Sequence, residues 1–298
     1  MPGPYKIVEK FARNSFPSFM APFAKKLIAW PRYYTQLKKS RSQYEQYKGK
    51  YNQPLLYVAG LPKSGTTWLE KMLCSFPGFC DVMIPEAVAF EQKHKQSHTF
   101  ELPAGLFNRF TKALVVLKLH AHGSLHNYKL LEQNKTRYVV LYRDLRDVAV
   151  SHIFYVQRTA YHPEHKDYKY LDTKEALKHF AATLLPEFIK WVDSWQAHTA
   201  SPLSYIVKYE DLTADPFNKL KEIAVHYGIQ TTDDELQYII KSNSFEKLSG
   251  GREKGVTDTS SFFRSGTSGD WKKYFDEETM ALYNNLLAGF LIKYGYNN

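Results

Sequence analysis

The chain has 298 residues, of which 44% are hydrophobic and 23% are charged, so it can bury the core of one large domain or of two small ones. Its net charge is +10, but residues 1–50 carry eleven Lys and Arg residues against two acidic ones, and the rest is almost neutral. A nucleic-acid-binding surface would spread this charge further, so nucleic acid is not expected as a partner. Two cysteines without a four-ligand cluster predict no zinc site and a reducing, cytoplasmic compartment.

The basic segment 1–50 is interpreted as an N-terminal extension packed on or beside a single catalytic domain over residues 51–298. Its aromatic and basic residues suit two roles: covering the core, or peripheral contact with an anionic membrane surface. Pro17, Pro22 and Pro31 favour the first role, because they are expected to break the segment into short helices. No apolar run reaches the roughly 20 residues that span a bilayer, so no transmembrane segment is expected.

Continuously apolar runs alternate with helical patterns along the body of the chain. The runs expected as buried parallel strands are 55–59, 113–119, 137–142 and 203–208. The segments expected as helices are 66–75, 124–133, 144–158, 174–198, 216–227, 233–241 and 277–294. This alternation predicts an α/β fold, a single P-loop-like domain with a central parallel sheet flanked by helices. Residues 249–269, rich in Gly, Ser and Thr, are expected to form a long functional loop.

The first expected strand runs into a turn that is suited to a phosphate group. The turn reads Gly-Leu-Pro-Lys-Ser-Gly-Thr-Thr-Trp over residues 60–68. The groups that can hold the anion are the backbone N–H groups at the helix start and the side chains of Lys63, Ser64, Thr66 and Thr67. A Walker A motif would place lysine directly after Gly65, where Thr66 stands, so no magnesium ligand is implied.

This turn resembles the 5'-phosphosulfate loop of the cytosolic sulfotransferase family, P-K-[ST]-G-T-[TS]-W, residue for residue from Pro62 to Trp68. The resemblance implies transfer of a sulfuryl group from 3'-phosphoadenosine 5'-phosphosulfate (PAPS) to a small-molecule acceptor, with release of PAP and without a metal. Lys63 would contact the bridging oxygen and stabilise charge on the leaving phosphate. The residues implied in holding the 5' end are Lys63, Ser64, Gly65, Thr66, Thr67 and Trp68.

Two further segments resemble the family's 3'-phosphate motifs. Arg143, at the end of the third expected strand, and Ser151, eight residues later, match the first motif, and an arginine fork can donate two hydrogen bonds to one phosphate. The second motif, R-K-G-x-x-G-x-W-K, is matched by Arg264, Gly266, Gly269, Trp271 and Lys272, and the same segment contributes Phe262. Ser265 is also assigned to the nucleotide site, although it stands where the family more commonly has a second cation.

By the same resemblance, the adenine side of the site is assigned to Tyr209 and Phe245, whose rings can stack on a base. Asn243 stands where the family often has threonine, and either side chain can hydrogen-bond adenine.

The expected catalytic base is His120, which ends the second expected strand and follows Lys118 in the family's K-x-H motif. An imidazole, with a reference pKa of about 6.5, can take the acceptor's proton near neutral pH. The competing assignment is His122, which lacks the family match. The catalytic set is therefore His120, Lys63, Lys118 and Ser151.

The sequence leaves the acceptor class open among phenols, alcohols, amines, sugars and lipids. Phe90, Phe154, Tyr155 and Tyr161, with residues 159–172, either line an acceptor pocket or belong to the core. The family's dimerisation motif is absent after the long loop over residues 249–269, so a monomer or a dimer with another interface is expected. Two alternative functions remain: a P-loop-type nucleotide kinase or NTPase, and a PAP-binding module without activity.

Overall fold

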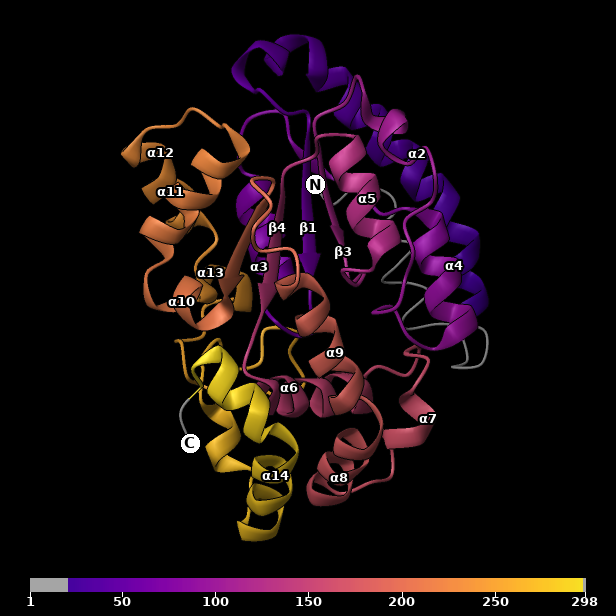
Figure 1. The fold of residues 1–298 in the computed structure, drawn as a ribbon, viewed down its shortest axis with the longest axis vertical. Coiled ribbons are helices and arrows are strands. Elements are labelled where there is room, and N and C mark those ends of the chain that lie inside the picture. Colours follow the sequence, from indigo (N-terminus) through magenta and orange to yellow (C-terminus); the bar gives the residue numbers. More distant parts are fainter. Residues whose placement is uncertain (1–20, 297–298) are drawn as a thin grey trace.

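The computed structural model describes residues 21–296, which fold around a five-stranded parallel sheet with strand order β2-β3-β1-β4-β5 (Figure 1). The strands are β1 (Leu55–Gly60), β2 (Cys80–Asp81), β3 (Val115–Leu119), β4 (Tyr138–Tyr142) and β5 (Ser204–Lys208). Tyr57 of β1 pairs with Leu117 of β3 on one side and with Tyr138 of β4 on the other. The α/β class expected from the sequence is confirmed, and only the two-residue strand β2 lacked an apolar run that could predict it.

Helices cover both faces of the sheet, because its central strands are apolar on both sides. The helices are α2 (Ala21–Tyr47), α3 (Thr66–Leu73), α4 (Pro85–His94), α5 (Leu125–Gln133), α6 (Leu145–Arg158), α7 (His165–Tyr168), α8 (Thr173–Thr183), α9 (Leu185–Gln196), α10 (Tyr209–Ala214), α11 (Pro216–Tyr227), α12 (Asp233–Ser242), α13 (Phe245–Ser249) and α14 (Glu277–Tyr294). Short 3-10 helices cover Lys48–Lys50, Phe107–Phe110 and Asp270–Lys273. No helix within residues 21–296 is both long and apolar enough to cross a membrane.

Alternate residues of β1 enter two separate hydrophobic clusters. Leu55, Tyr57 and Ala59 pack into a cluster with α5, α6, α8, α9 and α14, whereas Leu56 and Val58 pack with α3, α11 and α12 on the opposite face. Helices α6, α8 and α14 lie beyond the carboxyl ends of the strands (Figure 1). This placement leaves the strand ends between helical layers, where ligands of open α/β sheets usually bind.

Helix α2 differs from the expectation of short helices, because it continues through Pro31. A proline inside a helix removes a hydrogen bond and is tolerated only when other interactions compensate. Tyr33 and Leu37 are buried in the core, and Ser40 Oγ donates a 2.8 Å hydrogen bond to the carbonyl oxygen of Leu114. Tertiary packing along the core-facing side therefore holds α2 together across the proline.

The outer side of α2 exposes Leu27, Trp30 and Tyr34. The expected membrane contact of the N-terminal segment falls partly on residues 1–20, which lie outside the described residues. Residues 21–47, in contrast, form a helix that packs against α4 and β2.

The single helix expected over residues 174–198 is two helices, α8 and α9, which meet at Leu184. Pro186, in the first turn of α9, has no N–H to donate, so it fits where a helix starts and not where one continues. The break lets α8 bury Phe180 and α9 bury Trp191 and Trp195 in the same cluster. The expected loop is confirmed, since residues 250–269 contain no helix or strand.

Candidate active site

A cavity of about 420 Å³ lies where β1, β3, β4 and β5 end and the segments that follow them begin. The expected site residues that line it are Lys63, Gly65, Thr66, Thr67, Trp68, Lys118, His120, Arg143, Ser151, Tyr209, Phe245, Phe262, Arg264, Ser265 and Gly266. Ser64 and Asn243 lie beside the cavity but are not among the residues that line it. The structure thus brings together side chains that are up to about two hundred residues apart in the sequence.

The turn after β1 is shaped by two residues with left-handed backbone conformations, Lys63 (φ 66°) and Gly65 (φ 79°). A Cβ atom on Gly65 would lie 2.5 Å from the ring of Tyr209, so only glycine fits there. Helix α3 begins immediately afterwards at Thr66, which directs its free backbone N–H groups toward the turn. The hydroxyl of Ser64 is buried and has no hydrogen-bond partner within residues 21–296. The turn therefore offers donors to an anion.

The ammonium group of Lys63 lies against two aromatic rings. Its Nζ atom is 3.8 Å from the ring centroid of Tyr155 and 5.0 Å from that of Phe262. Such contacts attract a cation to the faces of the rings. Burial, together with the positive charges of Arg158 and Arg143, nevertheless lowers the pKa of Lys63 to about 7. A protonated Lys63 is therefore disfavoured in this part of the cavity, and a bound anion would stabilise its positive charge.

The second cation, Arg143, is buried at the end of β4. Its Nη2 atom donates a 2.7 Å hydrogen bond to the carbonyl oxygen of Thr267 and lies 3.2 Å from Asp147 Oδ2. Its guanidinium carbon is 4.4 Å from the ring centroid of Tyr209. The Nε atom is buried without a hydrogen-bond partner in the described part of the chain. Arg143 is thus held in place by protein groups while one donor stays unused.

Asp147 was not expected from the sequence to shape the site. Its Oδ2 atom accepts a 2.7 Å hydrogen bond from the backbone N–H of Gly269, and its Oδ1 atom accepts one of 3.0 Å from Trp271. The carboxylate therefore ties α6 to the end of the long loop while it contacts Arg143. The one sequence signal was an acidic residue in the first turn of the helix after Arg143, which is ordinarily explained as helix capping.

The third cation, Arg264, lies in the long loop and pairs with Asp270 at 2.5 Å. Arg252 supports this loop, because its Nη1 atom donates 2.9 Å hydrogen bonds to the carbonyl oxygens of Val256 and Arg264. Ser265 is buried and lines the cavity, although it carries no charge. The loop therefore presents one fixed arginine to the cavity.

The expected adenine side is built where the long loop crosses α13. A Cβ atom on Gly266 would lie 2.3 Å from the ring of Phe245, so the loop can pass over this ring only with glycine. Trp68 Nε1 donates a 2.9 Å hydrogen bond to the carbonyl oxygen of Asn243. The side-chain amide of Asn243 donates to Ser75 Oγ and to the carbonyl oxygen of Ile239, which fixes it beside the cavity.

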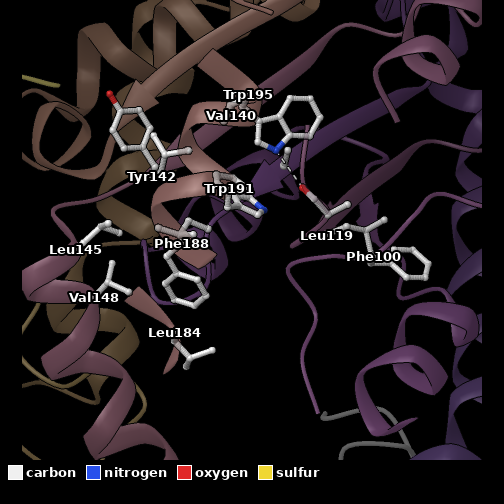
Figure 2. Close-up of a cluster of buried hydrophobic side chains, with 14 of the residues drawn as sticks. Phe100, Leu119, Val140, Tyr142, Leu145, Val148, Leu184, Phe188, Trp191 and Trp195 are labelled. Carbon is white, nitrogen blue, oxygen red and sulfur yellow. Dashed lines mark hydrogen bonds between the residues drawn. The ribbon is translucent and has the colours of Figure 1, made fainter. Parts of the chain in front are cut away.

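The backbone around His120 is fixed by two tryptophans of α9. Trp191 Nε1 donates a 2.7 Å hydrogen bond to the carbonyl oxygen of His120, and Trp195 Nε1 donates one of 3.0 Å to that of Ala121. Figure 2 shows both indole rings in the buried cluster with Leu119, the last residue of β3. The cluster thus sets the position at which the chain leaves β3.

The imidazole of His120 has a defined proton arrangement. Its Nδ1 atom lies 2.5 Å from the carbonyl oxygen of Gly60, and because a carbonyl only accepts, Nδ1 carries the hydrogen and Nε2 is the basic atom. Burial and the positive charges of Lys118 and Lys63 lower the pKa of His120 to about 4. The ring is therefore neutral near pH 7 and can accept a proton.

The two neighbours of His120 in the sequence have different positions. Lys118 lines the cavity, and its Nζ atom lies 3.5 Å from Glu70 Oε2. His122 is not among the residues that line the cavity, and its Nε2 atom lies 2.9 Å from Glu101 Oε1. Position in the cavity therefore favours His120 over His122 as the base.

Comparison with known proteins identifies the family of the chain. Residues 53–288 match the family model described as a sulfotransferase domain. The chain is 25% identical over 244 residues to sulfotransferase 1E1 of Cavia porcellus, covering 74% of this chain and 77% of that protein. It is 25% identical over 265 residues to flavonol 3-sulfotransferase of Flaveria bidentis, covering 78% of this chain and 80% of that protein.

Solved structures share the fold. The crystal structure of mouse sulfotransferase SULT7A1 complexed with PAP aligns with a TM-score of 0.59 at 19% identity, covering 85% of this chain and 90% of that one. Retinol dehydratase in complex with androsterone and inactive cofactor PAP aligns with a TM-score of 0.59 at 20% identity, covering 84% of this chain and 85% of that one.

Proposed function

The chain belongs to the sulfotransferase family, and we propose from this premise that it transfers a sulfuryl group from PAPS to a hydroxyl or amine of a small-molecule acceptor. The observation that carries the proposal is a single cavity lined by Lys63 of the turn after β1, by Arg143 and Arg264, and by His120. The presence of PAP in two structural neighbours supports the same nucleotide here.

The residues of the cavity fit PAPS in charge and in hydrogen bonding. Within residues 21–296, the Ser64 hydroxyl beside the cavity and the Arg143 Nε atom are buried donors without a hydrogen-bond partner, which two phosphate groups would satisfy. The lowered pKa of Lys63 reflects its burial and, after that, the neighbouring positive charges, which an anion would neutralise. Lys63 and Ser64 would hold the 5' end, whereas Arg143 and Arg264 would hold the 3'-phosphate. PAPS supplies the activated sulfuryl group when it is bound.

In the proposed reaction His120 accepts the proton of the acceptor at Nε2. The hydrogen bond from Nδ1 to the carbonyl oxygen of Gly60 fixes the tautomer, and the backbone is held by Trp191 and Trp195. Because this base is positioned by buried contacts, little reorganisation is needed during transfer. Burial, together with the positive charge of Lys118 beside it in the cavity, lowers the pKa of the imidazole and keeps it neutral before the reaction.

Lys63 stabilises the negative charge that develops on the leaving phosphate. Its ammonium group lies against the rings of Tyr155 and Phe262, and within residues 21–296 it forms no ion pair with a carboxylate. A charge that is oriented in advance lowers the barrier more than one that must rearrange. Lys63→Ala is therefore expected to reduce turnover by orders of magnitude while PAP still binds within roughly tenfold.

The test is transfer from labelled PAPS to a panel of phenols, alcohols, amines and sugars, alongside PAP binding measured by calorimetry. A protein that binds no PAP contradicts the proposal. PAP binding without transfer to any acceptor would favour a nucleotide-binding module. Magnesium-dependent ATP turnover would favour the kinase alternative, although Thr66 stands where that motif needs its lysine.

A further inference from the structure

The cavity continues past His120 into a region lined by polar side chains that the nucleotide does not require. Three histidines and a glutamate meet there: His98 from the segment after α4, His152 from α6, and His162 and Glu164 from the segment after α6. We define these four residues as the histidine pocket. None of them belongs to the motifs that hold PAPS in the proposed function.

The two buried histidines of this pocket are packed on aromatic rings. His98 is 3% exposed, and its ring lies edge-on to Phe188 at 5.2 Å between centroids. His152 is 4% exposed and contacts the rings of Tyr168 and Phe180 at 5.4 and 5.3 Å. Such packing fixes both imidazoles, so their nitrogen atoms have defined positions at the wall of the cavity.

The polar groups of the pocket are only partly satisfied by one another. Glu164 Oε2 lies 3.4 Å from His152 Nε2 and 3.8 Å from His162 Nδ1. The Nε2 atom of His98 is buried and makes no hydrogen bond within residues 21–296. Leaving a buried polar atom without a partner costs free energy, so a ligand that supplies one is favoured. Burial also lowers the pKa of His98 to about 4, so its ring is neutral and can accept or donate.

We infer that the histidine pocket receives a neutral acceptor with several hydroxyl groups, of the glycoside class, whose hydroxyls hydrogen-bond to His98, His152 and Glu164. This inference rests on the proposed sulfuryl transfer. A hydroxyl both donates and accepts, as the mixed imidazole and carboxylate groups require. Leu184 and Phe188, part of the buried cluster in Figure 2, also line the cavity and offer apolar contacts to the carbon skeleton.

Other acceptor chemistries fit the pocket less well. An anionic acceptor would meet the carboxylate of Glu164, whose contacts with His152 and His162 help to hold its pKa below the usual value. An entirely apolar acceptor would displace water from His98 and Glu164 and replace no hydrogen bond. A metal ion is not favoured either, because no three His, Cys, Asp or Glu side chains of residues 21–296 are arranged to hold one.

The test compares octyl glucoside with 1-octanol, which share the alkyl chain and differ in the sugar. Binding of each is measured by calorimetry to the full-length protein saturated with PAP. Octyl glucoside is expected to bind at least about tenfold more tightly, which corresponds to one or two hydrogen bonds. His98→Phe keeps the ring packing on Phe188 but removes the nitrogen atoms, and it should reduce this preference about tenfold. His94→Phe is the matched control, because His94 stacks on Phe90 outside the cavity and should leave the preference unchanged.

Transfer kinetics with labelled PAPS give the second measurement. His98→Phe should raise KM for octyl glucoside more than it lowers kcat, because His98 contacts the acceptor and not the reacting atoms. A wild-type preference for 1-octanol, or a preference for octyl glucoside that His98→Phe leaves intact in a variant with normal thermal stability, overturns the inference. Failure of both acceptors to bind overturns it as well, while PAP binding in the same experiment would leave the proposed function standing.

Discussion

Binding of PAP should transfer a proton from solvent to Lys63. In the free protein, burial and the nearby arginines lower the pKa of this ammonium group to about 7. At pH 8.5 only about 3% of the side chain is then protonated. A phosphate group among Lys63, Arg143 and Arg158 reverses the sign of the local charge, so the pKa should return toward the usual value of about 10.4 for lysine.

The size of the effect follows from the two pKa values. At pH 8.5 the complex should hold close to one more proton than the separated partners. PAP affinity should therefore fall by up to about tenfold per pH unit between pH 7 and 10, because binding is linked to protonation. The phosphate groups of the nucleotide do not contribute to proton uptake at pH 8.5, since the second pKa of a phosphate monoester is about 6.

The assay is calorimetry at pH 8.5 in two buffers with different enthalpies of ionisation, which gives the number of protons taken up. Lys63→Arg keeps a positive charge at every pH used, and Lys63→Met keeps none, so both should abolish the uptake from this site. Both replacements meet the same backbone angle, φ 66°, which makes them a matched pair. Uptake that persists in Lys63→Arg would assign the proton to another group. No uptake in the wild-type protein would mean that the rings of Tyr155 and Phe262 keep Lys63 charged despite burial.

Four other experiments test separate parts of the structure. His120→Ala should abolish transfer with little change in PAP affinity, whereas His122→Ala should stay active; the reverse result would make His122 the base. Because the pKa of His120 is lowered to about 4, kcat/KM for the acceptor, measured at saturating PAPS, should stay level from pH 7 to about 5, and an acid limb near pH 6.5 would contradict this. Arg143→Ala and Arg264→Ala should each cost about 1.5–3 kcal/mol, or roughly ten- to a hundredfold, in PAP affinity, and should affect adenosine 5'-phosphate much less. Ser40→Ala should lower the free energy of unfolding in urea by about 0.5–1.5 kcal/mol, because it removes one buried hydrogen bond to the carbonyl oxygen of Leu114, which still accepts from the backbone N–H of Cys80.

The nucleotide side of the cavity was predictable because its parts are local. The turn over residues 60–68, Arg143 and Tyr209 each follow a strand directly, and the carboxyl ends of parallel strands meet at one edge of the sheet. The apolar runs therefore predicted that these side chains lie at the strand ends, whereas their assignment to the nucleotide came from the family resemblance. The same reasoning fails for β2 and for Pro31, where contacts with distant residues and not local preference decide the outcome.

The acceptor side could not be predicted, because its geometry depends on contacts between distant segments. From the sequence, Tyr155 could belong either to the core or to a pocket. In the structure it packs on the buried cluster and also contacts Lys63. His98 and His152 carried no motif, and a histidine in an apolar context is ordinarily a core residue. They line a pocket only because three segments that are separate in the sequence meet in the fold.

The nucleotide side and the acceptor side of the cavity meet at Lys63. Binding on one side is therefore not expected to be independent of binding on the other. Phe262, from the loop that also carries Arg264, and Tyr155, from α6, both contact the ammonium group of Lys63. Phe262 is half exposed, and its ring lies edge-on to that of Tyr155, so the loop reaches the acceptor side through aromatic contacts. In the proposed function, a nucleotide whose 3'-phosphate contacts Arg264 would act on the same loop that helps to hold Lys63. Because these contacts share one short segment, nucleotide binding and the orientation of the lysine are expected to be coupled, and the nucleotide would set the cavity wall before the acceptor binds.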